Sequence, residues 1–543
     1  MTSVGGASLG IGVNVPSLSV VNSGGGAVLV NGAAPAIAVT NASTSGGGDL
    51  QIVNGGAINV TGNATNTGGS VIIATTGGLV QVSGSVQASN IAGVQGIGAT
   101  VSGSIQGAGG VVVNSGSGTI TNTGAITNGG GSAQITLRGD NMALAGGSVN
   151  SGSGMTLLRS DNDAQAISLG LGATGLGLDN GELATLVGAL QIGATTHAGG
   201  IFVDGPANRT TPASTTLYTT GGITVSNNLT IAGGGNLSLI GGSVNVASGS
   251  VQAMNVFLNG SSVLVQPGPA ATQNASVIAT NDLSINAGAF TLRGSDTIAG
   301  QAAKLLAGNA IVVGGTSIAI AGGNANMAPA SIDPLQVSIA ATGNFTMQGG
   351  AGTGSYATVY GDKVSIAGAN VQLLGGSGAG AHALVQSGTG GTTIAALTGG
   401  VIGVQAGTGA NANAGLVSLG AITAGTTCST CAVLTSNPYA PPTLSATGFY
   451  GAAGVMFPAA AAAAGGGGGT GGQVLDEVLV LLVNNAVSTV QLSSTATSSS
   501  TTTTTTGTDG DDSSSKSSVA GAATGDEKKT DEEKKKKARV PGC

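Results

Sequence analysis

The cysteines are the residues of this 543-residue chain best suited to covalent chemistry, and only three are present. Cys428 and Cys431 form a Cys-Ser-Thr-Cys pair, and Cys543 is the last residue. In a redox enzyme such a pair needs a helix N-terminus that lowers the thiol pKa, whereas here it lies in a Thr/Ser/Pro stretch. Tetrahedral zinc is poorly supported, because the two histidines, His197 and His382, are remote in sequence. The sequence around Cys428 and Cys431 therefore predicts neither a redox site nor a zinc site.

Two short motifs beside predicted strands could bind a partner or a cation. Arg138-Gly139-Asp140 is the integrin-type tripeptide and follows a strand-like run, where a loop would expose it as an adhesion site. The same pattern recurs as Arg293-Gly294-Ser295-Asp296, which favours a turn that ends a strand. Carboxylates at Asp161 and Asp163 have the i, i+2 spacing of some Ca²⁺ loops, but the Gly-Gly-x-Gly-x-Asp repeat of calcium-loaded β-rolls is missing. A turn is the expectation there as well.

The acidic residues do not predict an enzyme. Carbohydrate-cleaving β-helix enzymes need carboxylates that converge within about 10 Å on one face. In this chain most acids lie singly in predicted turns, and residues 50–137 and 210–281 contain none. No glycine-rich stretch precedes a Lys-Ser/Thr pair, so a phosphate-binding loop is absent from the sequence. We predict no catalytic residues, no cofactor and no metal site.

Composition excludes several classes of protein. Charged residues make up 6% of the chain, against about 25% in an ordinary globular domain, while 41% of the chain is apolar, which is too much for a disordered protein. No apolar run approaches the roughly 18 residues of a membrane-spanning helix. The net charge is −7, and residues 1–507 hold 13 acids against 6 bases, so no basic stripe for nucleic acid is expected.

Short apolar alternations with tight turns between them predict an all-β fold. The first such runs are Val28–Val30, Ile37–Val39, Leu50–Val53, Ile58–Val60, Val71–Ile73 and Leu79–Val82. Further along, the units repeat: Ile285, Val312, Ile339, Ile366 and Ile394 are spaced by 27, 27, 27 and 28 residues. Repeats of this length indicate stacked coils, and we predict a parallel β-helix over residues 1–425.

The composition changes three times after residue 425. Residues 426–472 gather several aromatic residues and the cysteine pair before an Ala/Gly-rich stretch, which predicts a cap and a flexible linker. Residues 473–492 contain a short amphipathic segment, which is predicted to be a helix with a β-strand as the alternative. Residues 493–543 are rich in Ser and Thr and then in charge, which is typical of a disordered tail.

One window carries a family resemblance. Between Met155 and Gly205, short β-type runs flank an acidic, helix-compatible segment near residues 174–193; the pieces are Met155–Arg159, Ala166–Gly170, Leu178–Leu186, Leu190–Gly193 and Gly200–Val203. This window resembles the recurring insert of filamentous haemagglutinin-type exoproteins, which are large surface adhesins exported by two-partner secretion. The charged tail ending in Pro and Cys is also similar to the tails of such exoproteins.

The resemblance implies a right-handed parallel β-helix, export through an outer-membrane two-partner secretion transporter, and a place outside or on the outer membrane of a Gram-negative bacterium. It also implies adhesion, aggregation or biofilm formation, with a host-cell or cell-surface glycan receptor. In an exported chain, Cys428 and Cys431 would form a small disulfide loop that staples a cap or holds the chain at its outer-membrane pore, or they would have no role. The sequence lacks the family's apolar leader and Asn-Pro-Asn motif, which leaves an upstream start and a split-gene fragment as alternatives.

Two functions from different classes remain for a protein of this kind. The first is an adhesin that acts through its extended repeat surface, and the second is a structural stalk or matrix rod without a receptor. Exposed aromatic or charged ridges on neighbouring coils would favour the adhesin, whereas a uniform Ser/Thr/Asn/Gly exterior would favour the stalk. The composition alone leans slightly toward the stalk.

Overall fold

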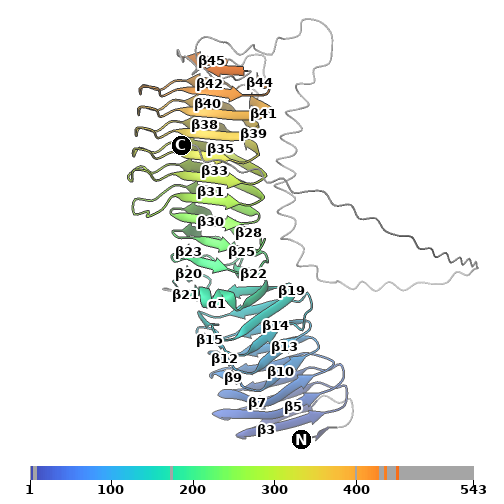
Figure 1. The fold of residues 1–543 in the computed structure, drawn as a ribbon. Helices are drawn as coiled ribbons and strands as arrows, with labels where there is room; N and C mark the ends of the chain where they lie inside the picture. Colours follow the sequence, from blue (N-terminus) through green and yellow to red (C-terminus); the bar gives the residue numbers. More distant parts are fainter. Residues whose placement is uncertain are drawn as a thin grey trace, which may run out of the picture. The chain divides into compact units, whose positions relative to one another are not determined.

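The protein is a stack of β-coils. The computed structural model describes residues 2–3, 9–171, 175–397, 400–426, 433–436 and 448–451, all within one compact unit. Its strands form a parallel β-solenoid of about 16 turns, so the predicted all-β fold and parallel β-helix are confirmed (Figure 1). Among the described residues, no helix is long and apolar enough to cross a membrane.

Strand pairing divides each coil into three faces, which we call A, B and C in chain order. Face A holds β2 (Leu9–Val13), β4 (Val28–Gly32), β6 (Leu50–Asn54), β8 (Val71–Thr75), β11 (Ile91–Gln95), β14 (Gly110–Asn114), β17 (Ile135–Arg138), β25 (Thr215–Tyr218), β28 (Leu237–Ile240), β37 (Gln336–Ala341) and β44 (Ile422–Thr426). Face B holds β9 (Val80–Val82), β12 (Ala99–Val101), β15 (Thr119–Asn122), β18 (Asn141–Ala143), β20 (Ile167–Gly170), β21 (Leu176–Asp179), β23 (Ile201–Val203), β26 (Gly222–Val225), β29 (Ser243–Val246), β38 (Asn344–Gln348), β40 (Asn370–Leu374), β42 (Ile402–Gln405) and β45 (Val433–Ser436).

Face C and the strands that turn a corner complete the coils. Face C holds β1 (Thr2–Ser3), β10 (Ser85–Ala88), β13 (Ser104–Gly107), β16 (Ala125–Thr127), β24 (Ala207–Arg209), β27 (Leu229–Ile231), β30 (Gly249–Ala253), β32 (Ala275–Ala279), β34 (Ala303–Ala307), β36 (Ala330–Asp333), β43 (Ala414–Ser418) and β46 (Gly448–Gly451). Two faces share β3 (Ser17–Asn22), β5 (Ala36–Thr44), β7 (Ala57–Asn66), β19 (Ser148–Arg159), β22 (Leu186–Gly193), β31 (Val256–Val265), β33 (Asp282–Arg293), β35 (Ala310–Ala321), β39 (Ala357–Gly368) and β41 (Ala383–Ala396).

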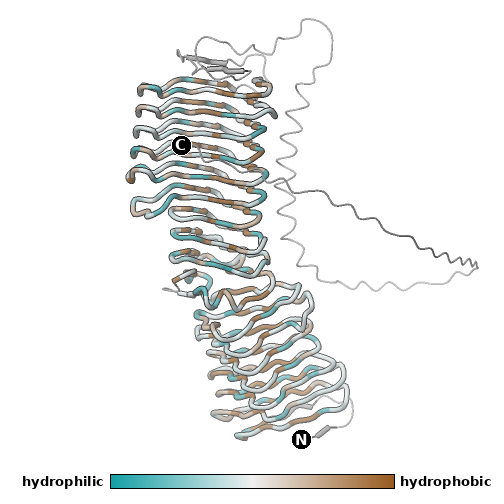
Figure 2. Tube along the Cα trace, viewed as in Figure 1, coloured by the Kyte–Doolittle hydropathy of each residue, from teal (hydrophilic) through white to brown (hydrophobic). Residues whose placement is uncertain are grey.

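The core is a set of aliphatic columns that run along the stack. On face A one column of in-register, buried side chains extends from Val30 to Ile394. Hydrophobic segments alternate with polar ones along each coil and stack on those of the next coil (Figure 2). Each aliphatic side chain buried in this way contributes about 1.5–3 kcal/mol, so the core needs few aromatic residues.

The register corrects one step of the predicted repeat. Ile285 pairs with Val313, and Val313 pairs with Ile339, so Val313 and not Val312 belongs to the buried column. Val313 is fully buried, whereas Val312 lies on the outer side of the strand. Successive side chains of a strand point alternately into and out of the coil, so a shift of one residue exchanges the buried and exposed positions. Because both residues are valine, the sequence did not reveal this one-residue error in the alignment.

The acidic segment of the window at residues 155–205 forms the only helix among the described residues, α1 (Asn180–Ala184). Asp179 caps it: its carboxylate accepts from the backbone N–H of Glu182, and the Glu182 carboxylate accepts from the N–H of Asp179. This reciprocal capping box stabilises a helix that is otherwise too short to persist.

Just before α1 the chain places a strand lower in the stack instead of higher. Strand β20 pairs with β21 on one side and β23 on the other, so the later strand β21 lies below the earlier strand β20 in the stack. Over this interval β17, β19, β22 and β25 on face A are accompanied by β18, β21, β20, β23 and β26 on face B. Face B therefore carries one strand more than face A.

At the C-terminal end two strands continue the stack past residue 425. β45 pairs in parallel with β42, and β46 pairs antiparallel with β43. Cys428, Cys431 and Cys543 lie outside the described residues, as do the predicted segment 473–492 and the predicted disordered tail 493–543. The predictions for them remain predictions.

Candidate functional site

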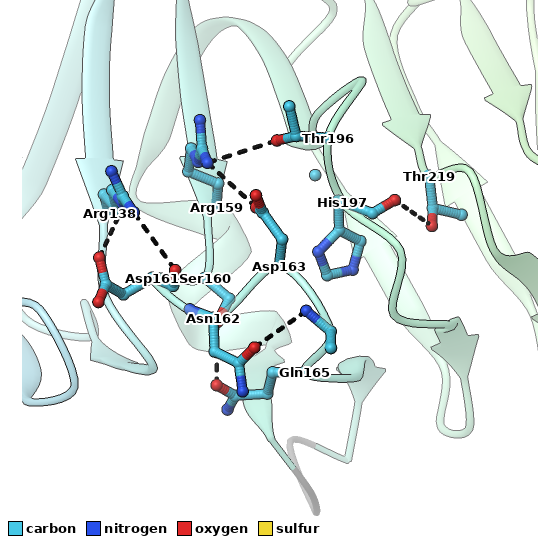
Figure 3. Close-up of polar contacts among 12 residues, drawn as sticks. Arg138, Arg159, Ser160, Asp161, Asn162, Asp163, Gln165, Thr196, His197 and Thr219 are labelled. Carbon is cyan, nitrogen blue, oxygen red and sulfur yellow. Dashed lines mark hydrogen bonds and ion pairs between the residues drawn. The ribbon is translucent and has the colours of Figure 1, made fainter.

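The Arg138-Gly139-Asp140 tripeptide lies at a corner between faces A and B, where strand β17 ends (Figure 3). Arg138 Nε is 2.8 Å from Asp161 Oδ1, and Arg138 Nη2 donates to the Asp161 carbonyl at 3.3 Å. The Asp140 carboxylate accepts from Ser160 Oγ at 2.7 Å and from the backbone N–H of Asn162 at 2.9 Å. Both charged side chains of the tripeptide therefore hold the next coil.

The same corner continues one coil further. Arg159 is in register with Arg138, and its Nη2 donates to Asp163 Oδ1 at 3.0 Å. Above it, His197 is completely buried, and neither ring nitrogen has a hydrogen-bond partner. The loop carbonyl of His197 accepts from the hydroxyls of Thr219 and Thr220 at 3.0 Å.

These contacts decide between interpretations of the two sequence motifs. The strand-ending turn is confirmed at both places where the pattern occurs, because β17 ends at Arg138 and β33 ends at Arg293, which pairs with Asp296 at 2.8 Å. Residues 160–166 also form a turn, in which Asp161 and Asp163 each pair with an arginine. As an adhesion loop, Arg138, Gly139 and Asp140 would have to break these contacts first.

A different surface is created by loops that link faces B and C in the C-terminal coils. They project from the coils that carry β33, β35, β38 and β40 (Figure 1). Gly294, Gly322, Gly349 and Gly375 begin them, and at each position a Cβ atom would collide with a carbonyl oxygen of the next coil. Because only glycine allows this close approach, the loops stack as regularly as the strands.

A shallow groove of about 380 Å³, which we call the tyrosine groove, lies where these loops lead into face C. It is lined by the C-terminal ends of three loops and by β34, β36 and β39. The side chains that give it chemical character are Lys304, Met327, Pro329, Asp333, Tyr356 and Tyr360. Tyr360 is 51% exposed, so much of its ring is open to a ligand. Among the described residues, no salt bridge includes Lys304 or Asp333.

Met327 reaches the groove from a strained backbone position. In the loop column formed by Gly300, Met327, Gly354, Gly380 and Asn411, every residue has a positive φ. Glycine and asparagine tolerate this conformation, whereas methionine at φ 54° costs about 1–3 kcal/mol. The Met327 side chain is nevertheless 62% exposed, so burial does not account for it.

An aromatic stack extends the groove along the solenoid axis. The rings of Tyr356 and His382 are parallel within 2°, with centroids 4.9 Å apart, which matches the spacing of adjacent strands. Pro329 occupies the equivalent position one coil earlier, as the backbone ladder shows. Burial lowers the pKa of His382, partly opposed by a hydrogen bond to Gly380, so the imidazole is mostly neutral at pH 7 and its face is available for stacking.

The arrangement of the groove is suited to binding. Asp333 is its one carboxylate, whereas glycoside hydrolysis requires a pair. Among the described residues, no three His, Cys, Asp or Glu side chains gather as metal ligands. Aromatic faces, one cation and one anion on neighbouring coils can together hold a polar ligand that also has apolar faces.

Sequence reasoning missed the tyrosine groove because its residues are spread from 304 to 360 and meet only through the coil register. The repeat period carried a usable signal. Aligned on it, Tyr356 and His382 fall at equivalent positions 26 residues apart, and Met327 stands where other units have glycine or asparagine. The buried Glu182, His197 and Arg209 were also missed as structural residues.

Comparison with known proteins adds no name to these surfaces, because no family model, curated protein or solved structure matches the chain. A functional hypothesis therefore depends on the geometry of the groove and on the sequence resemblance.

Proposed function

We propose that the protein is a surface-associated or secreted adhesin of the filamentous haemagglutinin type, which binds through its repeat surface. The tyrosine groove is the observation that supports this most directly. It places Tyr356 and Tyr360 with Lys304 and Asp333 on neighbouring coils, the arrangement that distinguishes a binding surface from a stalk with a uniform polar exterior.

The groove favours a glycan as the ligand. A sugar ring has an apolar C–H face that packs on an aromatic ring, and hydroxyls at its rim that need hydrogen-bond partners. Tyr356 and Tyr360 offer aromatic faces, while Lys304, Asp333 and Ser331 offer polar groups. Ladders of strands about 4.8 Å apart hold these groups in fixed positions, so a glycan pays little ordering cost on the protein side.

The strained Met327 supports the same conclusion. A residue that costs stability and is not buried is explained best by contact with a ligand. Its flexible thioether side chain adapts to irregular apolar surfaces. Export through an outer-membrane transporter and a location outside the cell belong to this proposal through the resemblance alone.

The test uses beads coated with the full chain and measures their attachment to glycan-bearing cells and to a glycan array. Attachment by the wild type and its loss, by about ten-fold or more, in Tyr360→Ala and Met327→Gly would support the proposal. Phe202→Ala removes another exposed aromatic ring, at β23 and outside the groove, and serves as the matched control.

Three outcomes would separate the alternatives. Equal attachment by wild type and Tyr360→Ala would exclude the groove as the binding site. No attachment of the wild type to any cell or glycan would leave the structural stalk as the better hypothesis. Because Met327→Gly removes backbone strain, a loss of attachment without a loss of stability would assign Met327 to binding and not to folding.

A further inference from the structure

The extra strand on face B forces a break in the hydrogen-bonded ladder. Face A is continuous across the region, with β17, β19, β22 and β25 paired in sequence. Strands lie about 4.8 Å apart, so a stack of five strands on face B is taller than the four-strand stack on face A. The strands of the two faces therefore do not stay level with each other. Among these described strands, no backbone pairing joins β18 to β21 on face B or β22 to β24 on face C. We call the segment from β18 to β24 the joint.

Side chains of α1 replace the missing ladder on face B and its edge. Glu182 Oε1 accepts from the backbone N–H of Leu144, just after β18, at 3.0 Å. Asn180 Nδ2 donates to the Pro206 carbonyl at 2.9 Å, and Asn180 Oδ1 accepts from the N–H of Asn208 at 2.6 Å. The short helix therefore links the coil below it to the coil above it.

The buried Arg209 side chain replaces the missing backbone hydrogen bonds on face C. Its guanidinium is only 2% exposed. One nitrogen donates to the carbonyls of Leu186 and Gly188 in the lower coil, and the other donates to the carbonyls of Ala213 and Ser214 in its own coil. Burial lowers its pKa to about 10, which leaves the group charged at neutral pH.

His197 covers the corner of the joint where the chain climbs from β19 to β20. The charged groups that face it are Asp163 and Arg159, both from the β19–β20 connection below, while the corner after β25 above it contributes the hydroxyls of Thr219 and Thr220. Asp163 is already paired with Arg159. The imidazole thus sits without a partner at the corner between faces A and B, next to the β19–β22 and β20–β23 pairings (Figure 3).

We propose that this corner of the joint, residues 160–166 and 194–200, acts as an acid-sensitive hinge that opens locally when His197 takes up a proton. This opening breaks the backbone hydrogen bonds from Ala198 and Gly199 to the Asp163 carbonyl, while the continuous ladder on face A keeps the coils connected. This proposal is independent of the adhesin function.

The direction of the pH effect follows from burial. Burial lowers the pKa of His197 below its ordinary value of 6.5, Arg159 acts in the same direction, and Asp163 opposes both. In the open state His197 binds a proton near pH 6.5, whereas in the closed state it binds one only at lower pH. The closed state is therefore most stable above pH 6.5 and loses stability as the pH falls toward the lowered pKa. Glu182 acts in the opposite sense: burial raises its pKa above 4.5, so protonation of Glu182 favours the closed state at lower pH.

The experiment is hydrogen exchange of the full chain at pH 7.5 and pH 5.5, corrected for intrinsic rates. Peptides that cover 160–166 and 194–200 should exchange faster at pH 5.5, by up to about ten-fold, because pH 5.5 lies one pH unit below the ordinary pKa of an accessible histidine. Peptides from β33 to β39 should show no change. His197→Gln should abolish the pH dependence at the joint, whereas His382→Gln, the matched control, should retain it.

A second measurement keeps the test decisive if His197→Gln weakens the fold. The chain has only two histidines, so ¹³C-labelled histidine gives two resonances, and His382→Gln assigns them. A His197 resonance that titrates below pH 6.5, together with the exchange change, supports the hinge. Titration at the ordinary value, uniform exchange along the chain at both pH values, or a pH dependence that survives His197→Gln would overturn it.

Discussion

The joint and the C-terminal coils solve the same stacking problem in different ways. From β31 to β41 every coil pairs with the next through continuous parallel ladders, and the interior is aliphatic. In the joint two ladders stop, and the three titratable side chains that are buried among the described residues, Glu182, His197 and Arg209, all lie there. Glu182 and Arg209 mark the places where backbone hydrogen bonds are missing, because each unpaired carbonyl or N–H needs another partner.

The two regions also differ in what they leave at the surface. In the C-terminal coils the regular ladder lets loops stack, and the groove is a consequence of that regularity. In the joint the polar groups of the loops are turned toward each other, as the pairs Arg138–Asp161 and Arg159–Asp163 show. Regular coils thus suit a binding surface, and the irregular joint suits a moving part.

Arg209→Met should have the largest effect on this contrast. Methionine fills similar volume but leaves the carbonyls of Leu186, Gly188, Ala213 and Ser214 without a donor. We expect local opening at the joint to become easier by about 2–4 kcal/mol, measured by native-state hydrogen exchange of peptides from β22 to β25. Arg293→Met removes an arginine whose ion pair with Asp296 is one-third exposed, and it should cost less than about 1 kcal/mol. Equal effects for the two variants would contradict the structural role of Arg209.

Gly349→Ala should have the next largest effect, and it acts on the C-terminal coils. The new Cβ would collide with the carbonyl oxygen of Ala381 in the next coil, and backbone cannot move aside without breaking the loop ladder. We expect a loss of about 1–3 kcal/mol, measured by hydrogen exchange of the loops, with weaker attachment through the tyrosine groove. Gly47→Ala is the control, since nothing lies within 4 Å of its Cβ position. An unchanged loop ladder in Gly349→Ala would show that the stacking is looser than the structure indicates.

The same comparison explains what the sequence could and could not predict. The coils, with two or three strands each, were predicted from short apolar runs and a period of roughly 20 to 27 residues, because each coil repeats the physical environment of the one before. The joint interrupts that period, so nothing in the pattern indicated that β21 lies below β20 or that Arg209 points into the core. The sequence predicted an acidic, helix-compatible segment near residues 174–193, and α1 lies within it. The partners of Glu182 and Asn180 could not be predicted, because they are 26 to 38 residues away.

The tyrosine groove was not predicted from the sequence for a related reason. The proximity of Tyr356 and Lys304 can be predicted only if two successive strand registers, β34 to β36 and β36 to β39, are known exactly. The predicted alignment was already one residue out at Val312. The tripeptide at Arg138 was recognised because its residues are adjacent, but adjacency said nothing about the partners one coil away.

The smallest predicted effect concerns that tripeptide, and it compares two arginines that end strands at different corners. Arg138→Ala removes an ion pair whose partners are about one-third exposed, so it should destabilise the corner by no more than about 1 kcal/mol. Arg293→Ala removes the equivalent strand-ending arginine in the C-terminal coils and should cost about the same by hydrogen exchange. Because Arg138 and Asp140 are engaged with Asp161, Ser160 and Asn162, Arg138→Ala should leave cell attachment unchanged. A selective loss of attachment in Arg138→Ala, with Arg293→Ala unaffected, would restore the tripeptide as an adhesion loop and show that its corner opens more readily than its contacts suggest.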